Sequence, residues 1–139
     1  MRHLFSVLVI ISLSFRLMAQ GNGPVISVLP DTVNMGEIHL SDLTAYHGKV
    51  LVEVLNSGKQ PLILTDVAGC CGTTIKEKPN APILPGKKGV IKVEFRIDAR
   101  PQVISRSVTI KSNAVNLKQI KVPIVGVVIA DKQSNEIVL

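Results

Sequence analysis

The chain has 139 residues, which is about the length of a single domain. Its 16 basic and 10 acidic residues give a net charge of +6, but the basic residues are scattered and only Lys87 and Lys88 are adjacent. A nucleic-acid-binding face needs clustered basic residues, and a base- or sugar-stacking surface needs more rings than one Tyr and three Phe. The composition therefore argues against a nucleic-acid partner.

The N-terminus has the layout of an export signal. A short positive start precedes an apolar run over residues 4–15, which Arg16 ends. The run is shorter than the roughly 20 apolar residues of a membrane-spanning helix. We therefore predict a secretory signal peptide over residues 1–19, cleaved after Ala19 or after Gly21. An uncleaved membrane anchor is the alternative.

Cleavage would leave a mildly basic mature protein. Removing residues 1–19 takes away Arg2 and Arg16 and no acidic residue, so the net charge falls from +6 to +4. No cysteine follows the apolar run, so a lipid-attached lipoprotein is not indicated. We expect an exported protein, periplasmic or extracellular, with no membrane span after cleavage.

Beyond the leader, the sequence predicts short strands separated by turn residues. Residues 20–31 form an extension that contains an opening strand at 25–29, and a second strand is expected at 32–38. Runs rich in Val, Ile and Leu predict the remaining strands, at 49–55, 61–67, 89–97, 105–111 and 117–128.

Several features favour an all-β fold. Aliphatic or aromatic residues alternate with Lys92, Glu94 and Arg96, which is typical of a half-buried strand, and no segment has a sustained helical period. About seven short strands predict a β-sandwich that ends before a polar tail at residues 130–139. Because Pro123 cannot donate a ladder hydrogen bond, its strand is expected to lie at a sheet edge or to break there.

Several sequence pieces, in this order and spacing, resemble a known family. They occupy residues 36–38, 54–64, 66–74, 82–86, 91–95, 108–113 and 125–128. Together they resemble the bacterial secreted domain of unknown function that carries a Ser-Cys-Gly-Cys-Thr motif, related to the Hydin-like and PapD-like immunoglobulin-type sandwiches. The resemblance covers residues 32–128. It implies an immunoglobulin-like β-sandwich of about seven antiparallel strands over residues 32–129, export from a bacterial cell, and no known activity.

The chain departs from that motif at its most distinctive place. Cys71 and Gly72 match the first Cys and the Gly of the motif, whereas Cys70 stands at its Ser and Thr73 at its second Cys. Two thiols separated by one glycine have thus become adjacent thiols. A role that depends on the original spacing is not carried over.

Cys70 and Cys71 are the only cysteines in the chain, and glycines flank them. A disulfide between neighbours is strained, because their Cα atoms lie only ~3.8 Å apart, and it would close almost no loop. The alternatives are a labile redox pair, a disulfide between chains, a two-thiolate Cu(I) site, or small apolar side chains buried beside a glycine turn. A closed zinc site would need His39 and His47 as further ligands, both far upstream.

We therefore expect a non-catalytic exported module with a binding or structural role, without a catalytic residue, cofactor or metal site. Sheet-edge contact with a protein or peptide is expected at the Pro123 strand or at the opening strand, residues 25–29. The alternative is a thiol-redox or copper-binding protein, with Cys70 and Cys71 as the candidate site. Glu53, inside a Val- and Leu-rich strand, is expected to face solvent or to pair with a lysine across the sheet.

Overall fold

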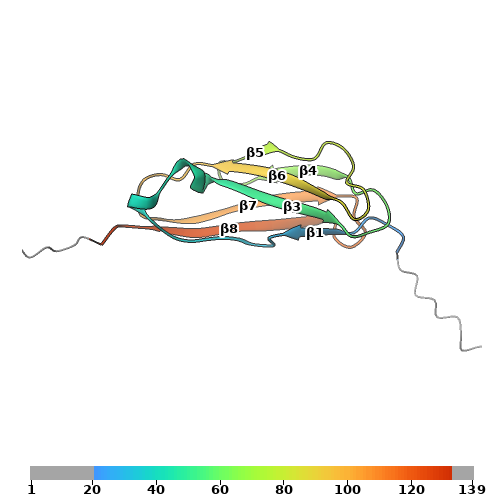
Figure 1. Cartoon of the computed structure of the whole chain (residues 1–139), viewed down its shortest axis with the longest axis horizontal. Helices are drawn as coiled ribbons and strands as arrows, with labels where there is room; N and C mark the ends of the chain where they lie inside the picture. The colour runs from blue at the N-terminus through green and yellow to red at the C-terminus, as the bar shows by residue number, and fades with distance from the viewer. Residues whose placement is uncertain (1–20, 133–139) are drawn as a thin grey trace, which may run out of the picture.

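The computed structural model describes residues 21–132, which form two four-stranded sheets packed face to face (Figure 1). Sheet A has the strand order β1-β3-β6-β5, and sheet B has the order β2-β8-β7-β4. The strands are β1 (Ile26–Leu29), β2 (Val33–His39), β3 (Lys49–Asn56), β4 (Leu64–Gly69), β5 (Thr73–Glu77), β6 (Lys88–Phe95), β7 (Gln102–Ser112) and β8 (Gln119–Ile129). The predicted leader, residues 1–19, and residues 133–139 of the predicted tail lie outside the described residues.

The predicted all-β, immunoglobulin-like sandwich is confirmed. Alternate side chains of each strand point into one aliphatic core, as the period of two requires. In β3 and β6, for example, Val52 and Ile91 lie opposite each other and are both fully buried. Two short 3-10 turns, Leu40–Asp42 and Ala45–Gly48, connect β2 to β3. Among residues 21–132, no helix is long and apolar enough to cross a membrane.

The opening strand is divided between the two sheets. β1 pairs antiparallel with β3 at one edge of sheet A, so the expectation of an edge strand at residues 25–29 is confirmed. The chain then crosses at the cis Leu29–Pro30 bond, and β2 pairs parallel with β8 in sheet B. The sandwich therefore has eight strand segments rather than about seven, and β2–β8 is a parallel pair where the sequence suggested antiparallel strands throughout.

The expectation that the Pro123 strand is an edge strand was wrong for β8 from Ile124 onward, which lies between β2 and β7; only residues 119–123, at its start, lack a paired strand on the β2 side. The reason is the direction in which the backbone of Pro123 faces. The backbone oxygen of Ser107 accepts a hydrogen bond from Cys70 on the β4 side, so the polar groups of Ser107 point away from β8. Ser107 lies opposite Pro123, so the Pro123 nitrogen points away from β7 in turn, and its missing N–H costs no hydrogen bond in that ladder.

β5 was not predicted at all. Its sequence, Thr-Thr-Ile-Lys-Glu, contains one aliphatic residue, Ile75, and begins directly after the two cysteines. The strand forms because it pairs antiparallel with β6, whose alternation is strong. Its formation places the cysteines in a tight turn between two strands rather than in a loose loop.

Candidate thiol site on the outer face of sheet B

The two cysteines lie in the turn that joins β4 of sheet B to β5 of sheet A. The backbone N–H of Thr73 donates to the carbonyl oxygen of Cys70 at 3.1 Å, which closes a four-residue turn. The two central residues, Cys71 and Gly72, have φ angles of 57° and 77°, as a type I′ turn requires. Glycine adopts this left-handed backbone freely, but a cysteine there carries a cost of about 1–3 kcal/mol.

Gly69 is required just before the turn because the chain passes very close to itself. A Cβ atom at Gly69 would lie 2.5 Å from the carbonyl oxygen of Thr73, closer than real Cβ atoms approach. The side-chain oxygen of Thr73 is itself buried and has no hydrogen-bond partner among residues 21–132. The turn is thus tightly packed around Thr73.

Cys70 faces outward from sheet B and lies across the ladder from Ser107 of β7. Its N–H donates to the Ser107 carbonyl oxygen at 3.0 Å, and the Ser107 hydroxyl donates to the Cys70 Sγ atom at 3.2 Å. Ser107 is only 4% exposed, whereas Cys70 is half-buried and Cys71 is exposed. Neither thiol is bridged and neither is part of the core, which leaves both available for chemistry.

The two thiols have opposite pKa shifts. Hydrogen bonds from Cys71 and from the hydroxyl and backbone of Ser107, with the charge of Lys121, lower the pKa of Cys70 below its ordinary value of 9.0, while partial burial opposes them. The hydrogen bond that Cys71 donates to Cys70 raises the pKa of Cys71, although Arg106 and Lys121 counteract it. Deprotonation of the pair thus favours a Cys70 thiolate beside a protonated Cys71.

A shallow groove of about 380 Å³ surrounds the pair. Its other lining residues are Ser105, Arg106, Ser107, Lys121, Pro123 and Val125. The Arg106 guanidinium donates to the carbonyl oxygen of Cys71 and lies 6.0 Å from the centre of the Phe95 ring, so it fixes the turn against the end of the core. The groove therefore combines two soft sulfur atoms with two cationic side chains.

The groove opens onto an aliphatic surface, which we call the sheet-B outer face and define by Val103, Pro123, Val125 and Val127. Val103 and Val127 lie opposite each other across β7 and β8, two residues along each strand from the pair of Ser105 and Val125. Val103 is 76% exposed and Val125 is 36% exposed. Contiguous aliphatic side chains of this kind are typical of contact surfaces.

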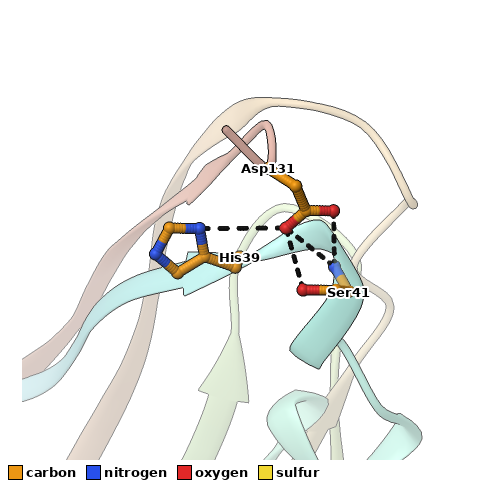
Figure 2. Close-up of polar contacts among 3 residues, drawn as sticks. All are labelled: His39, Ser41 and Asp131. Atoms are coloured by element: carbon orange, nitrogen blue, oxygen red, sulfur yellow. Dashed lines mark hydrogen bonds and ion pairs between the residues drawn. The ribbon is translucent and has the colours of Figure 1, made fainter. Parts of the chain in front are cut away.

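The structure brings together a serine, a histidine and an aspartate that the sequence analysis had not connected (Figure 2). Asp131 accepts hydrogen bonds from the Ser41 hydroxyl at 2.8 Å and from the Ser41 backbone N–H, and its Oδ1 atom lies 3.8 Å from Nδ1 of His39. In a nucleophilic triad, the histidine lies between the serine and the aspartate, whereas here the aspartate is between the other two. The cluster holds the end of β8 against the 3-10 turn.

His47, the other histidine considered as a ligand, is occupied in a cap. Its Nδ1 atom accepts a hydrogen bond from the Thr44 backbone N–H at 3.0 Å and lies 3.1 Å from the Thr44 hydroxyl. Over residues 21–132, no group of three or more His, Cys, Asp or Glu side chains is placed to hold a metal ion. Cys70 and Cys71 could offer a metal ion two sulfur ligands.

A family model described as a protein of unknown function, DUF1573, matches residues 28–128. The chain belongs to this family. The match runs from β1 to β8 and so includes both sheets and the cysteine turn. No curated protein sequence matches the chain.

Solved structures with a similar fold cover only part of their own chains. A protein of unknown function from Porphyromonas gingivalis W83 has a TM-score of 0.60 and 17% identity, over 82% of this chain and 51% of that one. The secreted serine protease VesC from Vibrio cholerae has a TM-score of 0.54 and 10% identity, over 78% of this chain and 24% of that one. The chain thus spans about half the length of the Porphyromonas protein, and these likenesses show the fold alone.

Proposed function

We propose that this chain is an exported, non-catalytic immunoglobulin-like module of the bacterial cell envelope that binds a protein partner. The observation that carries the proposal is the sheet-B outer face, where Val103, Val125 and Val127 leave an aliphatic surface beside the cysteine groove. Water-exposed aliphatic patches are costly to keep on a free monomer and mark contact sites. The arrangement of His39, Ser41 and Asp131, which does not place a base against the serine, supports a non-catalytic role.

The N-terminal sequence supports export. Residues 1–19 have the charge and apolar layout of a cleaved signal, and we propose that the sandwich works outside the cytoplasm, periplasmic or extracellular. We also propose that the turn containing Cys71 and Gly72 is this chain's counterpart of the Ser-Cys-Gly-Cys-Thr motif of secreted Hydin-like and PapD-like domains.

Site-specific photo-crosslinking in living cells tests the binding role. A photoreactive residue at Val103 should give a discrete adduct, whereas the same residue at Leu51, which is exposed on the outer face of sheet A, should give none. Osmotic-shock fractionation of the same cells should find the protein outside the cytoplasm, and deletion of residues 2–19 should retain it inside. Equal crosslinking at the two positions, or no adduct at Val103, would contradict the binding role.

The cysteine pair favours a second candidate function, a thiol-redox or Cu(I)-binding protein. Its specific support is the hydrogen bond from the Ser107 hydroxyl to the Cys70 Sγ atom, together with Lys121 nearby, because both stabilise a thiolate. Two adjacent thiolates are soft ligands suited to Cu(I). This candidate needs only the thiols and is independent of the sheet-B outer face.

Alkylation across a pH series, with and without Cu(I), tests the second candidate. Because the pKa of Cys70 is lowered, its alkylation should reach half-maximal rate below pH 9.0, and both Cys71→Ala and Ser107→Ala should move that midpoint upward. Cu(I) should protect both thiols in the wild-type protein. If neither substitution changes the pH of half-maximal alkylation, and Cu(I) does not protect the thiols, only the binding role remains.

A further inference from the structure

The outer edges of the sandwich are protected against pairing with another chain. Three of the four edge strands carry one extra residue relative to their neighbours: β2 between Asn34 and Glu37, β4 between Leu64 and Asp66, and β5 between Ile75 and Glu77. Bulges of this kind interrupt the row of backbone groups that an incoming strand would need.

The fourth edge strand, β1, is blocked by a side chain. Asn116 donates from Nδ2 to the Ile26 carbonyl oxygen at 2.9 Å, and its Oδ1 accepts from the Ile26 N–H at 3.0 Å. The amide thus takes the place that a neighbouring strand would occupy. Strand addition at residues 25–29, which the sequence suggested, is disfavoured for this reason.

A further edge segment, without a bulge, lies at residues 119–123 of β8. The parallel pairing with β2 begins only where Val33 meets Ile124, because β1 has paired into the other sheet. Along a strand, the backbone groups of successive residues point alternately to one side and to the other. Because those of Pro123 point away from β7, those of Lys121, two residues earlier, do so too. The N–H and C=O of Lys121 therefore face the side on which no strand pairs with residues 119–123.

The side chains around this segment define what would fit there. Lys118 and Lys121 are exposed, and neither forms an ion pair within residues 21–132. On the inner side of the same strand, Ile120 is only partly buried against the core. An added strand with acidic side chains facing out and aliphatic side chains facing in would neutralise the lysines and complete the cover of Ile120.

We propose that residues 119–123 of β8 are a docking site at which an extended partner segment, with alternating acidic and aliphatic residues, adds to sheet B as a strand. This inference rests on the proposed binding function and names the place and the chemistry of one partner segment. Main-chain hydrogen bonds to Lys121 hold the segment, and the alternation of its side chains sets its register. Lys121 also lines the cysteine groove, so the docked segment passes beside Cys70 and Cys71.

Hydrogen exchange of the purified protein, followed residue by residue by NMR, tests the site with a synthetic probe. In the free protein, the Lys121 amide should exchange quickly and the Val122 amide, which faces Val108 across the ladder, slowly. A Glu-Val-Glu-Val-Glu-Val-Glu peptide should slow exchange at Lys121 at least about tenfold, as a newly formed backbone hydrogen bond predicts. The matched Lys-Val peptide should not.

Two variants separate the backbone contribution from the charge. Lys121→Pro removes the outward N–H and leaves the β7 ladder intact, so it should weaken binding of the acidic peptide about tenfold. Lys121→Gln keeps the N–H and should weaken binding only a few-fold. Acidic peptides N-methylated at alternate residues test the same hydrogen bonds on the unaltered protein, and they should lose binding to a similar extent.

Four outcomes would overturn the proposal: slow exchange of Lys121 in the free protein, no change with the acidic peptide, an equal effect of the Lys-Val peptide, or protection confined to another strand. The crosslinking test at Val103 does not involve residues 119–123. An adduct at Val103 without peptide protection at Lys121 would therefore reject this docking site and leave the proposed binding function standing.

Discussion

The two outer faces of the sandwich have the same architecture and different chemistry. Sheet A carries three cross-strand ion pairs. Sheet B has one, Lys111–Asp66 at 3.4 Å between β7 and β4, and its sheet-B outer face is a row of valines and a proline that ends at the two cysteines. On sheet A, exposed Leu51 lies opposite Lys92, and exposed Leu29 and Val90 lie on either side of Glu53, so each faces a charged residue. The ion pairs of sheet A are Lys88–Glu53 at 2.8 Å, Lys76–Glu94 at 3.3 Å and Lys92–Glu77 at 2.5 Å.

Folding alone does not explain the sheet-B outer face. Both sheets bury similar aliphatic inner faces, so the outer residues are free to be charged, as sheet A demonstrates. Cross-strand charge pairs contribute up to about 1 kcal/mol each and keep a face solvated. Their absence among the described residues around Val103 and Val125 leaves a face suited to contact with another molecule.

The largest effect of a single substitution is expected in the turn that joins β4 of sheet B to β5 of sheet A. Gly69→Ala places a Cβ atom 2.5 Å from the Thr73 carbonyl oxygen, so β4 and β5 can no longer meet as they do. We expect a loss of about 2 kcal/mol in the free energy of unfolding, measured by denaturant titration. A free energy of unfolding that Gly69→Ala leaves unchanged would show that the turn is loosely packed.

A gain in stability is expected when the backbone strain at Cys71 in the cysteine turn is relieved. Cys71→Gly removes a side chain from a φ of 57° and should raise the free energy of unfolding by about 1 kcal/mol. Cys71→Ala removes the sulfur and keeps the strain, so its stability should stay close to that of the wild type. If Cys71→Gly is instead destabilised, the thiol itself holds the turn.

The smallest expected effect concerns the charged face. Glu53→Gln breaks the pair with Lys88 and should cost about 0.5 kcal/mol or less, because the pair is half-exposed, and 1 M salt should erase the loss. Lys121→Gln on the other sheet should have no such salt-dependent effect. A salt-dependent loss of similar size in Lys121→Gln would mean that the two faces do not differ electrostatically.

Much of the fold was predictable because its strongest strands alternate cleanly. β3 and β6 were placed within one or two residues, since Val, Ile and Leu recur at every second position. β5 was missed because a strand with one aliphatic residue forms only by pairing with a stronger neighbour. The pairing of Glu53 with a lysine was foreseen as one of two alternatives and is confirmed, because opposite charges on neighbouring strands attract.

The position of the Pro123 strand and the contacts of the cysteine turn depend on residues that are far apart in the sequence. The local sequence does not show to which side the nitrogen of Pro123 points. That direction is what allows a proline inside the β7–β8 ladder. The partners of the cysteine turn, Arg106 and Ser107, lie more than 30 positions away along the chain. The adjacent Cys70 and Cys71 indicated the site in the sequence, but its hydrogen bonds depend on which strand lies beside the turn.

The division of the first strand between β1 and β2 also has a mechanical consequence. The two ends of the described chain lie at opposite ends of the long axis of the sandwich (Figure 1), and β2 pairs in parallel with β8 from Val33 to His39. Tension applied between the two ends would therefore load the β2–β8 ladder in shear, so that its hydrogen bonds resist together instead of opening one by one. A sandwich tethered at both ends in this way resists pulling far better than its modest size suggests.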